Sequence, residues 1–252
     1  MTSKVVEGSI CSAKNLTFKT CFERYTRNRY KNFAYSSLET IGGVDLRQKT
    51  ILDAGTGEGW QTLLLASIGL PREIVAIDSA HGEGSSKDCL AVLSSNMKRM
   101  GIRNVGIARM DFPNNAFRDS SFNVVLALQS IHHMYVTRER ISVSSEAAEE
   151  YKRIFREFYR VLALGGWLII LEIRPTNLSE FLPLYRSEIN WPFHQEPEEL
   201  IELARAVGFA NVSLRWYVPF PLRHFRRLLE NKIGNWLTTS RYHVYAQKSS
   251  RS

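Results

Sequence analysis

The 252-residue sequence has few cysteines, no long hydrophobic run and no signal-type N-terminus, and each shortage argues against a class of protein. Its three cysteines, Cys11, Cys21 and Cys89, show neither the even count of a disulfide framework nor the paired spacing of metal ligands. The apolar runs FNVVLALQSI and WLIILEI fall short of the about 18 residues that indicate a membrane-spanning helix. MTSKVVEGSICSAK at the N-terminus lacks the apolar core of a secretory signal. We therefore expect reduced thiols and a cytoplasmic protein.

The net charge of +8 is concentrated at the two ends of the chain. Residues 1–40 carry seven Lys or Arg against three acids, and residues 221–252 carry seven against one. The stretch between them is slightly acidic. Basic ends of this kind suit nucleic acid, an anionic membrane surface or an acidic substrate.

The stretch TILDAGTGEG, residues 50–59, indicates a buried strand that runs into a glycine-rich turn and then a helix. Such turns let backbone N–H groups approach a ligand closely. Dinucleotide-binding turns have the spacing G-x-G-x-x-G, whereas here the third glycine comes one position early and Asp53 precedes the first. A carboxylate at this place suits a ligand with an ammonium and a sulfonium group better than a pyrophosphate, because opposite charges attract.

TILDAGTGEG resembles motif I of the class I S-adenosylmethionine-dependent methyltransferases. Asp78, at the end of EIVAID, matches the acid that binds the ribose hydroxyls in that family, and Asp111 with Phe112 matches the pair that frames adenine. YRVLALGGWLIILE resembles the family's helix–Gly-Gly–strand passage, with Leu164 in place of the common proline. The resemblance spans roughly residues 45–215 and is closest in style to the small-molecule group that includes ubiquinone and menaquinone methyltransferases.

The alternation of strands and helices, followed by a terminal hairpin, predicts a doubly wound α/β fold. With the resemblance, it implies a Rossmann-like, mostly parallel sheet of seven strands with an antiparallel C-terminal strand and helices on both faces. We expect an N-terminal helical or lid segment at 1–44 and a methyltransferase domain at 45–252, the latter with a substrate-side insertion at 174–197 and an amphipathic helix at 221–238.

S-adenosyl-L-methionine is the cofactor that the resemblance implies. The methyl group would pass to the substrate by direct displacement, helped mainly by alignment and exclusion of water. The predicted cofactor-binding residues are Asp53, Ala54, Gly55, Thr56, Gly57, Gly59, Asp78, Ser79, Asp111, Phe112, Gln129 and Ser130.

The fourth strand, FNVVLALQ, runs into SIHHM, and ligands of open parallel sheets bind beyond the carboxyl ends of the strands. His132 and His133 are therefore the catalytic candidates. One is expected to pack inward and the other to act as a general base or to orient the substrate, with His133 the preferred base. No third ligand is suggested nearby by spacing, so we expect no metal.

Aromatic and charged residues in two further regions are substrate candidates. Residues 18–38 predict one or two short helices whose aromatic residues either dock on the core or close over the ligands. The irregular stretch after the fifth strand either carries specificity or is ordinary packing. The candidates are Tyr25, Tyr30, Arg174, Tyr185, Trp191 and His194.

Residues 222–237 predict a basic amphipathic helix, with apolar residues at three- and four-residue intervals and arginines between them. It either docks on its own domain, caps a hydrophobic substrate, or lies on an anionic membrane. As a whole, the sequence predicts a methyltransferase that acts on a small, hydrophobic or aromatic molecule. The alternatives are an RNA or tRNA methyltransferase that uses the basic ends, a noncatalytic partner subunit that binds the cofactor, and, less favoured by the glycine spacing, a nicotinamide-dependent dehydrogenase.

Overall fold

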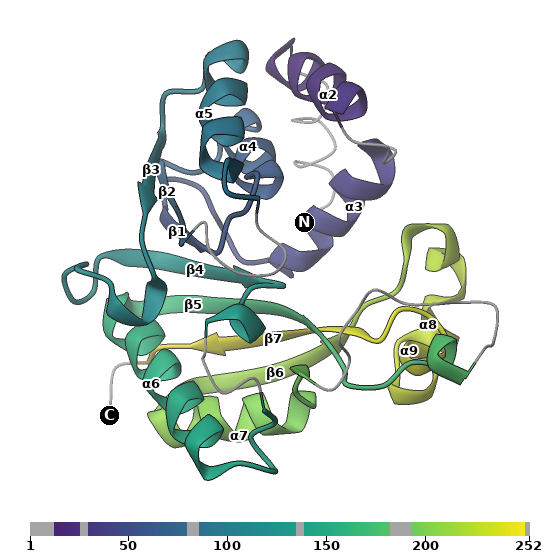
Figure 1. Cartoon of the computed structure of the whole chain (residues 1–252). Coiled ribbons are helices and arrows are strands. Elements are labelled where there is room, and N and C mark those ends of the chain that lie inside the picture. Colours follow the sequence, from purple (N-terminus) through teal and green to yellow (C-terminus); the bar gives the residue numbers. More distant parts are fainter. Residues whose placement is uncertain (1–12, 26–29, 80–85, 135–138, 182–192, 250–252) are drawn as a thin grey trace. The chain divides into compact units, whose positions relative to one another are not determined.

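A computed structural model describes residues 13–25, 30–79, 86–134, 139–181 and 193–249 (Figure 1). The chain forms two compact units, Met1–Asn115 and Ala116–Ser252, and each is described on its own. The domain limits expected at residues 44 and 45 stay a prediction.

The first unit contains three parallel strands in the order β3-β2-β1. β1 (Thr50–Ala54) is buried along its whole length, as its apolar sequence requires, and pairs with β2 (Glu73–Asp78). β2 pairs in turn with β3 (Val105–Arg109). The helices α4 (Trp60–Ser67) and α5 (Cys89–Met100) lie beside these strands in Figure 1.

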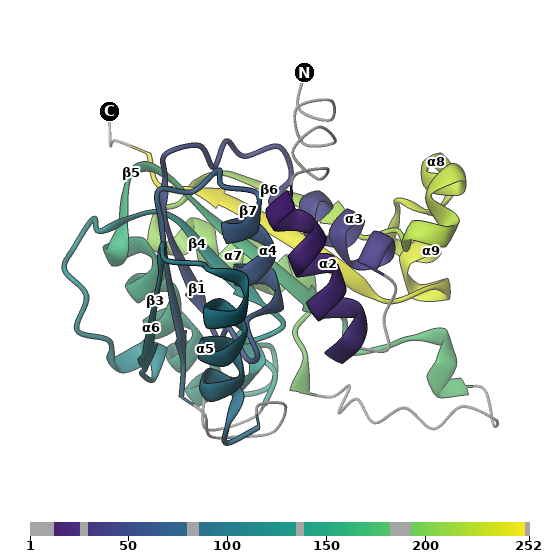
Figure 2. The same cartoon turned by 90° about the horizontal axis from the view of Figure 1, so that it is seen from above.

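The N-terminal helices α2 (Ala13–Tyr25) and α3 (Tyr30–Ile41) also belong to the first unit. In Figures 1 and 2, α2 lies next to α5. An aromatic cluster joins the two helices to α4: the ring centroid of Phe22 lies 4.4 Å from that of Phe33 and 5.3 Å from that of Trp60. Their aromatic residues therefore dock these helices on the unit, as one of the two interpretations of the sequence expected.

The second unit contains four strands in the order β4-β5-β7-β6. β4 (Phe122–Leu128) runs parallel to β5 (Leu162–Ile173), whereas β7 (Arg241–Gln247) is antiparallel to both β5 and β6 (Ala210–Trp216). Two longer helices complete the unit, α6 (Ser145–Val161) and α7 (Pro197–Val207).

The Gly-Gly step lies inside β5 and not before it. The pairing of β4 with β5 jumps from Phe122↔Leu162 to Val124↔Trp167, so that the extra residues bulge out of the ladder. A Cβ at Gly166 would lie 2.8 Å from the carbonyl oxygen of Ala163 and 2.9 Å from that of Asn123. Only a glycine lets these backbones approach so closely.

In the first unit, successive strands are added on one side of β1, in the order β1, β2, β3. In the second unit, β5 is added on the opposite side of β4. This reversal of strand order is typical of a doubly wound sheet. The predicted class, a seven-stranded and mostly parallel α/β fold with an antiparallel C-terminal strand, is confirmed. Among the described residues, no helix is both long and apolar enough to span a membrane.

The predicted amphipathic helix at 222–237 is wrong in its continuity. The structure divides the segment into the 3₁₀-helix η5 (Phe220–Phe225) and the short helices α8 (Arg226–Leu229) and α9 (Lys232–Leu237). The break falls at Asn231, whose side-chain oxygen accepts from the backbone N–H groups of Ile233 and Gly234 and so begins a new helix. Gly234 packs tightly on the backbone of Leu229, which fixes the bend.

Candidate functional site

The glycine turn of the first unit connects β1 to α4. Gly55, Gly57 and Gly59 all have positive φ angles, of 80°, 54° and 75°, which favour glycine. The N–H groups of Gly55 and Thr56 both donate to the carbonyl of Ile77, at 2.9 Å, which ties the turn to β2. A Cβ at Gly57 would meet nothing within 4 Å, so the turn presents its backbone to open space. The open space beside Gly57 fits close approach by a ligand.

Two carboxylates accept hydrogen bonds from this turn and from the start of α4. Asp53 is 2% exposed and accepts from the hydroxyls of Thr56, at 2.9 Å, and Thr62, at 2.5 Å. Burial raises the pKa of Asp53, although both hydroxyl contacts oppose that shift. One carboxylate oxygen of Asp78 accepts from the N–H of Gly57 at 2.9 Å.

The third carboxylate of the first unit follows β3. The N–H of Met110 donates to the carbonyl of Asp78 at 3.1 Å, which leads the chain to Asp111 beside the end of β2. Asp111 is exposed and accepts from the amide of Asn114 at 3.0 Å, while the neighbouring Phe112 is buried. Asp53, Asp78 and Asp111 thus all lie at the carboxyl ends of adjacent parallel strands, where this fold class binds ligands.

The other predicted cofactor-binding residues divide between the two units. Ala54 is fully buried at the end of β1, and Ser79 is half-buried directly after β2. Gln129 and Ser130 belong to the second unit, where they follow β4. Contact of each with the cofactor stays a prediction.

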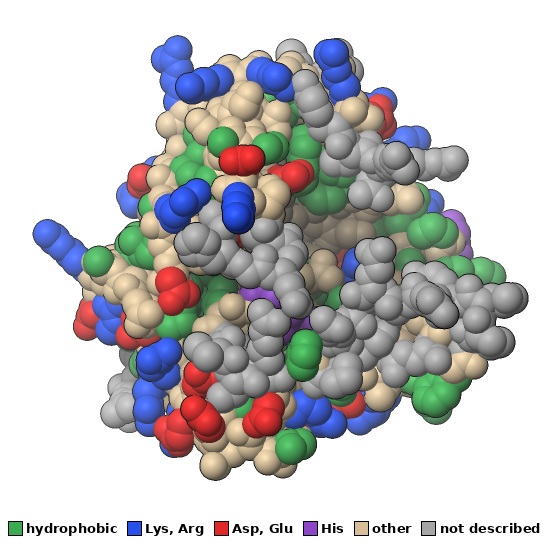
Figure 3. Space-filling model, viewed as in Figure 1, with side chains coloured by type: hydrophobic (Ala, Val, Ile, Leu, Met, Phe, Trp, Pro, Cys, Tyr) green, Lys and Arg blue, Asp and Glu red, His purple; other side chains and the backbone are tan. Residues whose placement is uncertain are grey.

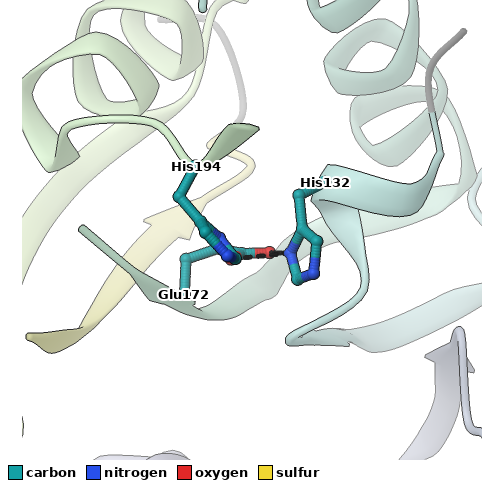
Figure 4. Close-up of side chains that lie close together, drawn as sticks. All are labelled: His132, Glu172 and His194. Atoms are coloured by element: carbon teal, nitrogen blue, oxygen red, sulfur yellow. Dashed lines mark hydrogen bonds and ion pairs between the residues drawn. The ribbon is translucent and has the colours of Figure 1, made fainter. Parts of the chain in front are cut away.

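Three side chains of the second unit meet beyond the carboxyl ends of β4 and β5 (Figure 4). His132 lies in η2 (Ile131–His133), directly after β4, and its Nδ1 lies 2.9 Å from both carboxylate oxygens of Glu172. Glu172 is 1% exposed near the end of β5. The Nδ1 of His194 lies 3.4 Å from the Oε2 of Glu172, and its ring centroid lies 4.3 Å from that of His132.

His194 is held in place by its neighbour Gln195, which is 2% exposed. The side-chain oxygen of Gln195 accepts from the N–H of Ile141 at 2.8 Å, and its amide donates to the carbonyl of Glu139 at 3.2 Å. The hydroxyl of Tyr242 on β7 donates to the backbone carbonyl of Gln195 at 2.8 Å. The segment before α7 is therefore fixed to the sheet, and His194 is fixed with it.

The charge of Glu172 governs the cluster. Burial alone would raise the pKa of Glu172, yet His132 and His194 hold it far below its ordinary range. Burial alone would lower the pKa of His132, but the charge of Glu172 and its hydrogen bond outweigh burial and raise it. The arrangement favours an ionised Glu172 that fixes the ring of His132 through Nδ1, while the His132 side chain keeps 13% of its surface exposed.

The same cluster offers two imidazole nitrogens and a carboxylate oxygen within 4.8 Å of one another, a donor set that could hold a metal ion. Spacing in the sequence does not indicate a third ligand, because Glu172 and His194 are far from His132 in the chain. The expected absence of a metal stays a prediction.

His133, the preferred base in the sequence analysis, is exposed, and its ring centroid lies 4.0 Å from that of His132. The contact with the buried carboxylate belongs to His132. The structure thus distinguishes two histidines that the sequence could not.

The remaining substrate candidates lie in different surroundings. Tyr30 is buried in the aromatic cluster of the first unit. The guanidinium of Arg174 is buried and donates to Glu196 at 3.0 and 3.3 Å. Tyr185 and Trp191 lie outside the described residues, as does the side chain of Tyr25. Of the candidates that the structure describes, His194 joins the cluster with His132. The substrate role of each stays a prediction.

Glu172 was missed as a site residue by sequence reasoning. A signal existed, because a carboxylate in the apolar run WLIILEI occupies a buried strand and must have a partner there. The identity of that partner depends on the pairing of β4 with β5, which the sequence does not specify residue by residue.

The sequence is similar to a known protein family. A sequence profile described as "Methyltransferase domain" matches residues 52–170, from the glycine turn to β5. The profile match and the fold together support a class I S-adenosylmethionine-dependent methyltransferase. The cofactor is S-adenosyl-L-methionine, and the carboxylates and glycine turn of the first unit are the residues available to hold it.

Individual members of this superfamily are only distantly similar. The phthiotriol/phenolphthiotriol dimycocerosates methyltransferase 1 of Mycobacterium ulcerans is 25% identical over 205 residues, a match that covers 81% of this chain and 66% of the relative. The phosphoethanolamine N-methyltransferase 2 of Haemonchus contortus, solved with S-adenosyl-L-methionine, has a TM-score of 0.61 at 17% identity, over 97% of this chain and 60% of its own. The [4+2]-cyclase SpnF has a TM-score of 0.61 at 18% identity, over 89% of this chain and 84% of its own. These two structures support the fold.

Proposed function

We propose that this methyltransferase is an active enzyme that methylates a small, hydrophobic or aromatic molecule, with His132 as its general base. The observation that carries the proposal is the contact of the His132 Nδ1 with both oxygens of Glu172 at 2.9 Å. A carboxylate at Nδ1 fixes the tautomer in which Nδ1 carries the proton, so Nε2 keeps its lone pair. A histidine held in this way can accept a proton from a substrate.

The chemistry needs little beyond alignment and a place for one proton. Bound S-adenosylmethionine supplies an electrophilic methyl group on a sulfonium. The substrate's oxygen or nitrogen gives its proton to Nε2 of His132 and uses its electron pair to bond the methyl carbon. Transfer would break the carbon–sulfur bond, return its electrons to sulfur and release the neutral thioether S-adenosylhomocysteine. Glu172 stabilises the imidazolium that results, because its negative charge is buried beside the ring.

Two observations support a small substrate. The curated relative from Mycobacterium ulcerans is named for phthiotriol and phenolphthiotriol dimycocerosates, which are not nucleic acids. In Figure 3, Lys and Arg side chains are scattered over the face shown and mixed with Asp and Glu, whereas a nucleic-acid track needs a continuous basic stripe. An RNA substrate for the basic ends is the alternative to be tested beside it. The cytoplasmic location expected from the sequence stays a prediction.

A noncatalytic, cofactor-binding subunit is the other alternative, because the fold alone does not imply methyl transfer: the similar fold of SpnF carries a cyclase. A subunit that only binds the cofactor would need no base. Burying the charge of Glu172 costs folding free energy unless the charge is paired. A protein without a catalytic base would have no use for this carboxylate beside His132.

The test uses the whole chain with S-adenosylmethionine labelled in its methyl group. Separate reactions receive a protein-free small-molecule extract, total RNA, or no acceptor. Label that passes to an organic-soluble small molecule, with loss of transfer in His132→Gln, supports the proposal. Label in RNA, or cofactor binding by calorimetry without transfer to either acceptor, contradicts it.

A further inference from the structure

The short helices at the end of the second unit carry an exposed apolar surface. Four large side chains of η5, α8 and α9 are largely in solvent: Phe225 is 57% exposed, Leu228 73%, Ile233 72% and Leu237 48%. Phe181, which is 68% exposed, lies beside them, with its ring centroid 6.2 Å from that of Trp236 in α9. We call these five residues the apolar edge. In Figure 3, hydrophobic side chains show at the right of the view in separate places, above and below the grey atoms.

The apolar edge contradicts the simplest interpretation of the amphipathic sequence. A helix that docks on its own domain buries its apolar stripe. Here that stripe faces water, which costs free energy in proportion to the apolar area left exposed. Something other than the described part of this chain must cover the edge for its residues to contribute stability.

The edge is a rigid platform, since buried polar side chains fasten it to the sheet. Asn235 is fully buried and donates to the carbonyls of Arg241 and Tyr217. The amide of Asn177 donates to Ser240 at 2.8 Å and to the carbonyl of Trp236 at 3.2 Å. The edge is therefore already formed before a partner binds, so little ordering entropy opposes binding.

Ion pairs add to this rigidity. Glu230, between α8 and α9, accepts from Arg226 at 2.7 Å and from Arg215 on β6 at 3.1 Å. Both arginines and Glu230 are only half-buried, and the pairs hold the bend between α8 and α9 against the sheet.

Cations flank the apolar edge and define the charge of its partner. Residues 220–237 contain four Lys or Arg against one acid. Arg223, Arg227 and Lys232 are exposed. The guanidinium of Arg223 lies 4.1 Å from the ring centroid of Phe220, so it stays at the same surface as the apolar residues. Exposed aromatic and aliphatic side chains with Lys and Arg around them suit an interface where acyl chains meet anionic headgroups.

We propose that the apolar edge and its flanking cations dock this protein on an anionic membrane surface. Phe225, Leu228, Ile233 and Leu237 enter the boundary between headgroups and acyl chains, while Arg223 and Arg227 contact lipid phosphates. A second copy of the chain fits the edge less well, because an isologous interface brings the same cations face to face. The docking is independent of methyl transfer and does not need the proposed function.

Co-sedimentation with vesicles tests the proposal on the full chain. Vesicles of phosphatidylcholine mixed with phosphatidylglycerol bind the protein, whereas vesicles of phosphatidylcholine alone bind it weakly. Leu228→Ser with Ile233→Ser weakens binding at least about tenfold, from the lost burial of two large side chains. Arg223→Gln with Arg227→Gln weakens it by about fivefold for each charge and removes much of its salt dependence.

Matched controls come from elsewhere on the surface. Val143→Ser with Leu164→Ser removes two large side chains that are 76% and 66% exposed, and Arg103→Gln with Arg118→Gln removes two exposed charges. Neither pair changes vesicle binding. Circular dichroism and the thermal midpoint confirm that every variant folds.

Three outcomes overturn the proposal. The first is equal binding to neutral and anionic vesicles, and the second is equal loss in the control pairs. The third is no vesicle binding by a protein that dimerises in light scattering and becomes monomeric in Leu228→Ser with Ile233→Ser, which assigns the edge to a second copy.

Discussion

The Nδ1 of His132 lies equally close, at 2.9 Å, to both oxygens of the buried carboxylate of Glu172, 40 residues later in the chain. A single carboxylate thereby sets the orientation and the proton affinity of one histidine in a pair. His133, its neighbour in the chain, is exposed. Of the two adjacent histidines, His132 is therefore the one whose orientation and proton affinity are set by a buried carboxylate.

Glu172→Gln tests this control through the pH dependence of activity. The pKa of His132 is raised by Glu172, and a base works only when neutral, so kcat/KM rises with pH through that pKa. Without the negative charge the imidazolium is less stable, and the rising limb moves to lower pH. On the high-pH plateau, kcat/KM of the variant is about tenfold to a hundredfold lower, within the lower range of general-base effects. Glu149→Gln, which removes an exposed carboxylate, leaves both unchanged. A limb that stays in place in Glu172→Gln contradicts the assignment.

Chelation separates the base from a metal site at the same three side chains. We expect activity to survive dialysis against EDTA, because direct contact with Glu172 already orients the ring of His132. Metal analysis of the purified protein accompanies the assay. Activity that is lost on dialysis and restored by zinc would assign His132, Glu172 and His194 as ligands and remove His132 as a base.

Asp78→Ala weakens binding of S-adenosylmethionine by about 1–3 kcal/mol, the scale of a lost hydrogen bond to a charged group. Titration calorimetry measures the effect, with the exposed Asp88→Ala as control. Because Asp78 also accepts from the N–H of Gly57, Asp78→Asn is the informative companion: it keeps an acceptor for that N–H but loses the charge. Full affinity in Asp78→Asn would mean that Asp78 only shapes the turn, and full affinity in Asp78→Ala removes it from the site.

Gly59→Ala destabilises the first unit more than Gly101→Ala does. Both glycines have left-handed φ angles, 75° and 64°, so each substitution costs about 1–2 kcal/mol of backbone strain. A Cβ at Gly59 would also collide with the buried side chain of Leu93, whereas one at Gly101 meets nothing within 4 Å. Overpacking adds about 1–3 kcal/mol. Urea unfolding measures the difference, and in a Leu93→Ala background the excess cost should vanish. Equal costs at both glycines contradict the clash.

His243 makes the second unit sensitive to acid. Burial lowers the pKa of His243 from 6.5 to about 3, so the unfolded chain takes up this proton first as the pH falls. Its contribution to stability is complete above pH 6.5 and declines by about 1.4 kcal/mol per pH unit below it, until the pH approaches 3. His243→Phe keeps a ring between Tyr217 and Tyr245 and should flatten the unfolding free energy over this window. The same slope in the variant and the original protein would rule His243 out as the cause.

The fold was largely predictable because its signals are local. The run EIVAID predicts a strand over residues 73–78, and β2 occupies those residues. The third glycine also has a local cause, since Gly59 is the N-cap residue of α4 and has a left-handed φ angle of 75°. Once parallel strands are recognised, the acids that follow them share one edge of the sheet, and the resemblance to the methyltransferases then implies cofactor contacts for Asp53, Asp78 and Asp111.

The rest depends on contacts between distant residues. Glu172 and His194 meet His132 only because β5 pairs with β4 and Gln195 fixes the segment before α7. The amphipathic pattern at 222–237 indicated helix correctly, but hydrophobic spacing does not reveal the helix break at the N-cap residue Asn231. It also does not show whether the apolar stripe is buried against another surface.

Gln129 has a φ angle of 52° where β4 ends, and its N–H still donates to the carbonyl of Leu171 at 2.7 Å. A glutamine gains nothing from this left-handed conformation, which a glycine adopts without strain. The kink nevertheless turns the chain directly out of the ladder and into η2. The protein thus keeps an unfavourable backbone conformation three residues before His132. This indicates that the orientation of the imidazole matters more here than an unstrained end of β4.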